Sequence, residues 1–256
     1  ALPSRHLGLV QAAEHPALEA MIERAADLAV DHLDLDALMA LARRARLAGP
    51  VARLGVPPPG QRIALAADAA FAFAYPAQLE AWRAAGAEVR SFSPLADKSP
   101  DADADAIVLP GGYPELHAAR LAANARFLCG VRAAGARGAT VYGECGGYMV
   151  LGEALIDAEG MRHAMAGLLP LVTTFAEPRL ALGYRDLMLA ADTPLGPRGA
   201  RFRGHEFHYA TTLAGGGAPL FHARDANDHA LGPAGMVAGR VCGSFLHLID
   251  SVDDRS

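Results

Sequence analysis

Short apolar runs alternate with longer stretches of helical periodicity between residues 61 and 143. The apolar runs predict β-strands at Ile63–Ala67, Glu88–Phe92, Ala106–Leu109 and Thr140–Gly143. A helix is expected to begin at Pro76, because proline suits a first helical turn, and an alanine-rich helix is expected from Glu115 to Ala134. Strands and helices that alternate in this way predict an α/β fold, with a mostly parallel sheet and helices on both faces.

The pattern changes on both sides of this region. After residue 155, apolar runs separated by glycine- and proline-rich turns such as Asp157–Gly160 predict a β-rich, antiparallel C-terminal part. The segment before residue 61 predicts a short strand, two helices and a proline-rich linker, at Arg5–Val10, Leu18–Val30, Leu35–Leu47 and Gly49–Gly60. One strand and two helices bury too little surface to fold alone. We therefore divide the chain into residues 1–60 and a domain of residues 61–256.

Composition narrows the class of function. The chain has 256 residues, of which 52% are hydrophobic, and a formal net charge of −5 at pH 7. A globular fold is expected, and neither nucleic acid nor an anionic membrane is expected as a partner. Its three cysteines have spacings that fit neither a disulfide framework nor a zinc site, which favours a reducing cytoplasm. No apolar stretch is long enough and free enough of charge to span a bilayer.

Cys145 has the sequence context of a reactive cysteine. A strand that ends at Gly143 leads into the Gly146–Gly147 turn and then into an apolar segment with the character of a helix. A sharp strand-to-helix turn exposes the sulfur at the sheet edge, and the unpaired N–H groups of the next helix favour the thiolate. The glycines let a substrate approach and leave backbone N–H groups free for an oxyanion. A buried structural cysteine is the alternative, but it gives no reason for the flanking glycines.

A second glycine pair, Gly111–Gly112, follows the strand that ends at Leu109. An ordinary tight turn is one interpretation, although it needs only one glycine. In the other, a backbone N–H of this pair and that of Gly146 form an oxyanion hole beside Cys145. Both glycine turns follow strands of the predicted parallel sheet, and active sites lie at the carboxyl ends of such strands.

A nucleophilic cysteine requires a base, and His247 is the best placed of the ten histidines. It lies in a mostly apolar run near the end of the chain, where strand alternation puts Phe245, His247 and Ile249 on one face. A histidine satisfied within the core is the competing interpretation.

Two further polar features, Arg185 and the segment Gly204–Tyr209, each allow more than one interpretation. Arg185 is a candidate for binding the α-carboxylate of a substrate, because an arginine fork matches a carboxylate, but a solvated surface arginine fits equally well. The run Gly204–Tyr209 contains two histidines without the spacing of a helical metal motif. A strand would send His205 and His208 to opposite faces, so no metal site is expected.

Four motifs of the sequence point to the same protein family: Leu109–Glu115, Glu144–Met149, Gly204–Tyr209 and Gly243–His247. Together they resemble the class I glutamine amidotransferase domain, a flavodoxin-like α/β fold. They are most similar to the branch found in the cobyrinic acid a,c-diamide synthases of corrinoid biosynthesis. The resemblance implies that Cys145 is the nucleophile that attacks L-glutamine and His247 the base. It places the oxyanion hole at the glycine motifs, with Gly112 favoured over Gly111.

The chain departs from the pattern of the wider superfamily at one position. Most class I amidotransferases carry a glutamate two residues after the histidine, and this chain has Ile249 there. The diamide synthase branch is thought to work with a Cys–His dyad, so the departure favours that narrower assignment.

The resemblance also implies a larger enzyme. Residues 1–60 resemble the end of an ATP-dependent synthetase domain, which would use ATP, Mg²⁺ and ammonia to amidate the a and c carboxylates of cobyrinic or hydrogenobyrinic acid. No cofactor is expected in this chain itself, because Lys98–Ser99 follows Asp97 and not the glycine of a P-loop. Two alternatives remain: an amidotransferase of the cobyric acid synthase or cell-wall-precursor type, and a catalytically inactive amidotransferase-like binding module.

Overall fold

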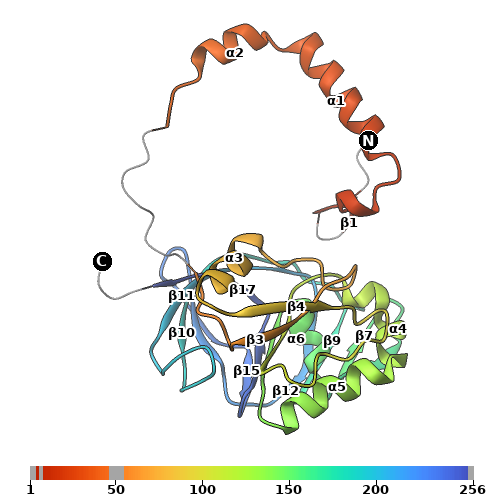
Figure 1. Cartoon of the computed structure of the whole chain (residues 1–256), viewed down its shortest axis with the longest axis vertical. Coiled ribbons are helices and arrows are strands. Elements are labelled where there is room, and N and C mark those ends of the chain that lie inside the picture. Colours follow the sequence, from red (N-terminus) through yellow and green to blue (C-terminus); the bar gives the residue numbers. More distant parts are fainter. Residues whose placement is uncertain (1–3, 6–7, 46–54, 253–256) are drawn as a thin grey trace. The chain divides into compact units, whose positions relative to one another are not determined.

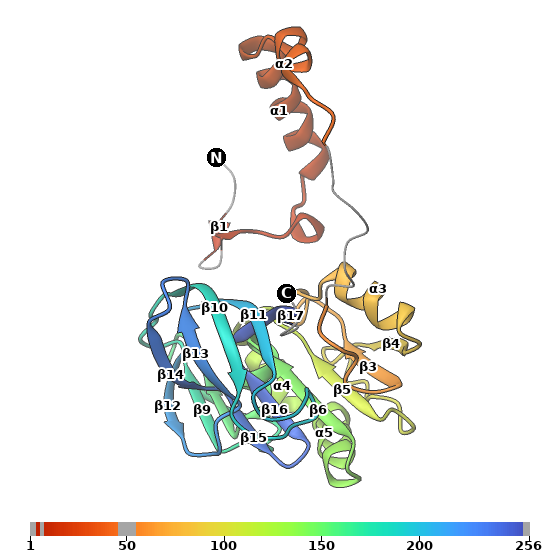
Figure 2. The same cartoon turned by 90° about the vertical axis from the view of Figure 1, so that its left-hand side faces the viewer.

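The computed structural model describes residues 4–5, 8–45 and 55–252, and the chain divides into two units, residues 1–52 and 53–256. Figures 1 and 2 show both units from two directions. None of the described helices is long and apolar enough to cross a membrane.

The first unit is a short hairpin followed by two helices. Its elements are β1 (Ser4–Arg5), β2 (Gly8–Leu9), η1 (Ala12–Glu14), α1 (Leu18–His32) and α2 (Leu35–Leu41). Both predicted helices are confirmed, but α2 ends six residues before the predicted Leu47, and residues 46–47 lie outside the described residues. Most of the predicted linker, residues 46–54, also lies outside them. Neither helix buries any of its described side chains.

A six-stranded sheet forms the centre of the second unit. Its order is β15 (Met236–Ala238), β16 (Val241–Ser244), β6 (Thr140–Glu144), β5 (Ala106–Leu109), β3 (Arg62–Ala66) and β4 (Glu88–Phe92). All pairs are parallel except that of β15 with β16. The four predicted strands are confirmed to within one residue.

The helices of this unit differ from the prediction at one place. Helix α3 (Pro76–Ala84) begins with Pro76 in its first turn, as predicted. The single helix expected from Glu115 to Ala134 is wrong: η2 (Pro114–His117), α4 (Ala118–Ala123) and α5 (Ala125–Ala136) replace it. The break lies at Asn124, whose side-chain amide donates to the carbonyls of Pro94 and Leu95 at 2.7 and 3.2 Å.

The remaining strands confirm the β-rich C-terminal part. An antiparallel sheet has the order β14 (Ala230–Ala234), β13 (Phe221–Asp225), β10 (Ala181–Leu189), β11 (Arg201–His208) and β17 (Leu246–Val252). A smaller mixed sheet has the order β12 (Thr211–Gly215), β9 (Leu171–Thr174), β7 (Ala154–Ile156) and β8 (Arg162–Ala164). Helix α6 (Gly146–Leu151) connects β6 to β7.

Two hydrophobic clusters cover the two faces of the central sheet. Ile63 and Leu65 of β3 pack with Trp82 of α3 and with apolar residues of the five-stranded sheet. The alternate residues of β3 pack in the other cluster, with Phe127 of α5 and the apolar residues of α6. Figure 1 shows α3 and α5 on opposite sides of β3 and β4. The predicted helices on both faces are therefore present, and one face is shared with the antiparallel sheet.

The segment just before β3 is bound to the second unit. The N–H of Gly55 donates to Asp250 Oδ1 at 3.0 Å, and Ser251 Oγ donates to the Gly55 carbonyl at 2.9 Å. Trp82 Nε1 donates to the Val56 carbonyl at 2.9 Å. Gly55 and Val56, which the sequence grouped with the first segment, thus pack beside α3 and β17.

The topology brings three motifs to one edge of the sheet. In the parallel register Leu109 of β5 lies opposite Gly143 of β6, and Glu144 of β6 lies opposite Ser244 of β16. The carboxyl ends of β5, β6 and β16 are therefore neighbours. The glycine pair at 111–112, the cysteine at 145 and the histidine at 247 each follow one of these strand ends.

Candidate active site

Cys145 occupies a strained turn between β6 and α6. Its φ of 50° and ψ of −106° lie where a residue with a side chain is rarely found, which costs on the order of 1–3 kcal/mol. The turn is held by a hydrogen bond from the Cys145 N–H to the Ser244 carbonyl at 2.8 Å. It also requires Gly147, because a Cβ there would lie 1.8 Å from the Leu109 carbonyl oxygen. Close packing against β5 and β16 thus fixes the sulfur at the strand end.

His247 meets Cys145 as predicted. Its side chain is buried and forms a hydrogen bond with the thiol of Cys145. Nδ1 of the same ring lies 3.2 Å from Glu144 Oε1 and 3.2 Å from the hydroxyl of Tyr75. Because Nδ1 has these two partners, Nε2 is the nitrogen left for the sulfur.

The surroundings of His247 favour its charged form. Burial alone would lower the pKa of the imidazole. The hydrogen bonds and negative charges of Cys145 and Glu144 outweigh burial and raise the pKa of His247 to about 10. The imidazole of His247 is therefore mostly protonated at neutral pH.

Glu144 contacts the base, and the sequence analysis did not single it out. It is only 4% exposed, and its Oε2 accepts hydrogen bonds from the Leu248 N–H at 3.0 Å and the Tyr142 hydroxyl at 3.1 Å. Burial and the Glu144 charge raise the pKa of Tyr142 well above its ordinary value, so this phenol is a neutral donor. The carboxylate is thus held on one oxygen and presents the other to His247.

Tyr75 and His205 extend the network on the other side of the imidazole. The Tyr75 hydroxyl lies 2.8 Å from His205 Nε2, and the His205 ring stacks on His247 with centroids 4.6 Å apart. Burial first, and the charge of Glu144 second, raise the pKa of Tyr75. Burial first, and then the charge of His247, lower the pKa of His205. Tyr75 therefore acts as a neutral donor to a neutral His205.

The sequence contains a signal for two of the three residues Glu144, His205 and Tyr75. Glu144 stands in the cysteine motif and His205 in a motif without an assigned role, whereas nothing in the local sequence distinguishes Tyr75. As predicted, His205 and His208 diverge, since His208 stacks instead on Phe245, with centroids 4.0 Å apart. Among the described residues no group of three or more His, Cys, Asp or Glu is arranged to hold a metal ion.

The glycine turns lie against the cysteine. A Cβ on Gly146 would lie 3.1 Å from the Gly112 nitrogen, so the two backbones are close neighbours. Within the described part of the chain, neither the Gly112 N–H nor the Gly146 N–H has a recorded hydrogen-bond acceptor. Gly111 instead lies against the imidazole, because a Cβ there would lie 2.6 Å from His247 Cε1. The structure thus brings together five of the predicted residues: Gly111, Gly112, Cys145, Gly146 and His247.

Arg185 lies outside this group. Its Nε and a terminal nitrogen each lie 2.9 Å from Glu206 Oε2, and Glu206 Oε1 lies 2.9 Å from His208 Nε2. Burial alone would raise the pKa of Glu206, but His208 and Arg185 lower it overall. The guanidinium of Arg185 already binds the carboxylate of Glu206. Binding of a substrate carboxylate by Arg185 therefore stays a prediction, and it requires the substrate to displace Glu206.

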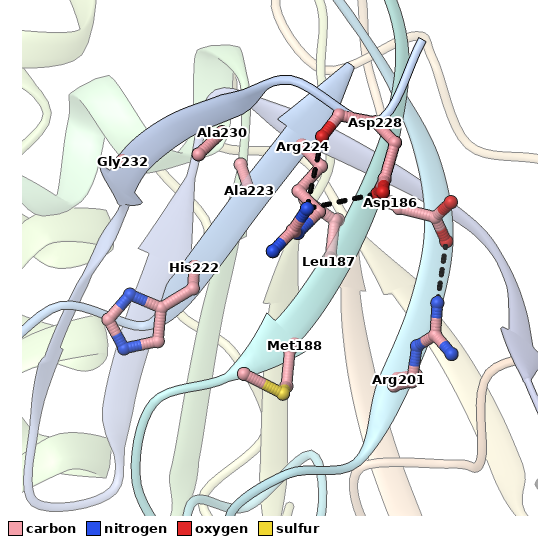
Figure 3. Close-up of a pocket in the computed structure, with 10 residues that line it drawn as sticks. All are labelled: Asp186, Leu187, Met188, Arg201, His222, Ala223, Arg224, Asp228, Ala230 and Gly232. Atoms are coloured by element: carbon pink, nitrogen blue, oxygen red, sulfur yellow. Dashed lines mark hydrogen bonds and ion pairs between the residues drawn. The ribbon is translucent and has the colours of Figure 1, made fainter. Parts of the chain in front are cut away.

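A separate hollow lies on the five-stranded sheet. It measures ≈ 590 Å³, and its charged side chains form the ion pairs Arg201–Asp186 at 3.7 Å and Arg224–Asp228 at 3.1 Å. Figure 3 shows Asp186 on β10, Arg201 on β11 and Arg224 on β13, with Asp228 in the turn that follows β13. None of the residues that line it belongs to the group around Cys145.

Comparisons with known proteins agree with this geometry. The family model of the CobB/CobQ-like glutamine amidotransferase domain matches residues 62–254. The chain is 56% identical over 251 residues to the hydrogenobyrinate a,c-diamide synthase of Rhodobacter capsulatus and 54% identical over 253 residues to that of Brucella abortus. Each match covers 97% of this chain, but only 56% and 57% of the relatives. The chain thus spans a little over half their length.

Solved structures support the fold. The structure of PurLQS from Thermotoga maritima matches with a TM-score of 0.50 and 20% identity, covering 73% of this chain and 87% of that chain. This likeness concerns the fold alone. With the family match over residues 62–254 and the two relatives above, the chain belongs to the CobB/CobQ-like glutamine amidotransferase family.

Proposed function

We propose that this chain hydrolyses L-glutamine and releases ammonia for an amidation reaction. The observation that supports the proposal most strongly is the cysteine at a positive-φ turn, hydrogen-bonded to a histidine whose other ring nitrogen faces Glu144. A thiolate activated by an adjacent imidazole is the arrangement that attacks amide carbonyls.

The proposed reaction begins from the thiolate–imidazolium pair. Cys145 Sγ attacks the side-chain carbonyl carbon of glutamine, and the carbonyl oxygen becomes an oxyanion that the Gly112 and Gly146 N–H groups bind. His247 Nε2 gives its proton to the leaving nitrogen, the C–N bond breaks, and ammonia departs. The neutral imidazole then takes a proton from water, whose oxygen attacks the thioester. The C–S bond breaks, glutamate is released, and the thiolate–imidazolium pair is restored.

The test is glutamate release by the whole chain. We expect C145A to abolish hydrolysis because the nucleophile is lost. C129S is the matched control, since Cys129 is free and exposed on α5. Glutamine hydrolysis that persisted in C145A, or that was lost equally in C129S, would contradict the proposal.

We further propose that the ammonia amidates the a and c carboxylates of hydrogenobyrinic or cobyrinic acid in a longer enzyme. The printed names of the relatives support this acceptor, and the chain spans only part of their length. ATP and Mg²⁺ belong to the proposal for the longer enzyme. The residues at Lys98 do not fit a phosphate-binding loop, because the preceding Asp97 instead accepts the Phe127 N–H at 2.9 Å. We derive no step through either group.

In this proposal residues 1–60 are the end of the synthetase domain and the protein is cytoplasmic. Within the first unit, Met39 and Leu41 of α2 are 72% and 71% exposed, and helices that bury no apolar face against each other support a segment of a larger domain. The free cysteines support a reducing compartment.

The acceptor is tested with the intact enzyme, ATP, Mg²⁺ and glutamine. Mass spectrometry should show two amide additions to hydrogenobyrinic or cobyrinic acid. Amidation only of corrinoid carboxylates other than a and c, or only of a cell-wall precursor, would replace this acceptor and leave the glutaminase proposal intact. Failure of a glutamine-like electrophile to label Cys145 would favour the inactive binding module.

A further inference from the structure

We propose that Glu144 is a positioning residue of the site, and that its carboxylate replaces the one that the wider superfamily carries two residues after the histidine. The inference rests on the proposed function. It makes the site a Cys145–His247–Glu144 triad in which the strand that presents the nucleophile also supplies the carboxylate.

Glu144 contacts both the imidazole of His247 and the backbone of the residue that follows it. Its Oε1 lies 3.2 Å from His247 Nδ1, and its Oε2 accepts the N–H of Leu248 at 3.0 Å. One carboxylate therefore fixes the imidazole and the backbone of the next residue together. The contact at Nδ1 orients the ring so that Nε2 faces the sulfur. It also favours the tautomer with the proton on Nδ1, which leaves Nε2 free to accept the proton of the thiol.

The position that carries the carboxylate in related enzymes cannot supply it here. Ile249 has no polar atom in its side chain, and it is 50% exposed. The neighbouring Asp250 accepts the Gly55 N–H, so its carboxylate is used elsewhere. Glu144 is the only carboxylate recorded within 4 Å of His247 in the described part of the chain.

Charge gives an independent argument. A carboxylate that is 4% exposed is costly unless a cation and hydrogen bonds compensate it. Among the described residues, the ion pair recorded for Glu144 is the one with His247, and no Lys or Arg pairs with it. The other titratable groups that face His247 are Cys145, Tyr75 and His205. Tyr75 and His205 are neutral, so neither of them supplies the charge that compensates Glu144, and His247 is left as its cationic partner.

The test compares E144Q with wild type in the whole chain. Glutamine at position 144 keeps an oxygen for the Leu248 N–H but turns a donor toward Nδ1, which favours the wrong tautomer of His247. We expect kcat to fall by about 100-fold or more, with KM for glutamine within about threefold of wild type. The alkaline limb of kcat should move to lower pH, because the imidazolium loses its carboxylate. E144D should recover part of kcat, and E159Q, on an exposed turn, should match wild type.

A merely structural role predicts a different result. It would lower the melting temperature of E144Q but leave the alkaline limb and kcat of the folded fraction unchanged, and that result would overturn the proposal. If E144Q does not fold, ¹⁵N NMR of His247 in the wild-type chain decides. Protonated Nδ1 is expected at neutral pH, and an unprotonated Nδ1 would contradict the role of Glu144.

A readout without glutamine separates this inference from the proposed function. Iodoacetamide should alkylate Cys145 at pH 7 at least about tenfold more slowly in E144Q, because fewer molecules hold the thiolate–imidazolium pair. Slow alkylation in E144Q with no glutamine hydrolysis in wild type would refute the glutaminase and retain the triad. Hydrolysis in wild type with an unchanged alkylation rate in E144Q would retain the glutaminase and refute the triad.

Discussion

Gly111→Ala adds one methyl group directly against the imidazole of His247. The new Cβ would lie 2.6 Å from His247 Cε1, 3.3 Å from a Phe73 ring carbon and 3.4 Å from Cys145 Cβ. Ordinary carbon–carbon contact begins near 3.4 Å. The imidazole must therefore shift by on the order of 0.8 Å from the position in which it forms its hydrogen bond with Cys145.

The expected cost falls on the reaction more than on the fold. A displacement of about 1 Å in a catalytic group lowers the rate by about 100-fold, so we expect kcat of G111A to fall by that factor. Overpacking costs about 1–3 kcal/mol, and the smaller entropy of the unfolded alanine chain offsets about 0.4–1 kcal/mol of it. The net cost is about 0–2.6 kcal/mol, which corresponds to a drop in melting temperature of at most about 10 °C for a domain of this size.

The assay measures glutamate release and thermal unfolding of G111A beside G216A. Gly216 is the matched control, because a Cβ there meets nothing within 4 Å and its φ is not in the left-handed region. G216A should keep wild-type kcat and melting temperature. A G111A chain that is folded and retains kcat within about threefold of wild type would refute the placement of His247 against this turn.

Further predictions concern the groups around the imidazole and the buried ion pair. Y75F removes the hydroxyl that joins His247 and His205, and kcat should fall by about 3–10-fold with little change in melting temperature; an unchanged kcat would show that this hydrogen bond is dispensable. The folded pKa of His247, about 10, lies above its unfolded value near 6.5, so its contribution to stability is complete below about pH 6.5 and is lost as pH rises through 10. Thermal unfolding between pH 6 and pH 10.5 should show this loss in wild type and not in H247Q; parallel curves would contradict it. R185M leaves the half-buried Glu206 with only His208, which should cost about 1–3 kcal/mol in chemical denaturation with KM for glutamine nearly unchanged. A tenfold rise in KM without destabilisation would instead support the predicted binding of the substrate carboxylate by Arg185.

The sequence predicted β3, β4, β5 and β6 of the central sheet, and β5 is the clearest case because it is an uninterrupted apolar run followed by a proline; β15 and β16 were not predicted as part of this sheet. It also predicted which turns would meet, since the carboxyl ends of adjacent parallel strands share one edge. The break at Asn124 could not be predicted from local pattern. Its cause is a pair of carbonyl acceptors at Pro94 and Leu95, about thirty residues away in sequence.

The candidate site shows the same limit. Cys145 and His247 stand in motifs whose residue types indicate their chemistry. Tyr75 reaches His247 across 172 positions of sequence, and only the placement of the segment before α3 brings its hydroxyl there. Glu144 directly precedes the cysteine in sequence, but strand alternation does not reveal that its carboxylate contacts the imidazole of His247. Its role emerges only from the register that puts Glu144 opposite Ser244, at the end of the strand that leads to His247.

The most direct test of the account is covalent labelling of the whole chain with a diazoketone analogue of glutamine, followed by peptide mass spectrometry. The account predicts one label per chain on Cys145, protection by L-glutamine, and no label on Cys129 although that thiol is exposed. Labelling of Cys129 in preference to Cys145, or labelling of Cys145 that glutamine does not suppress, would contradict a glutamine-binding nucleophile at this turn.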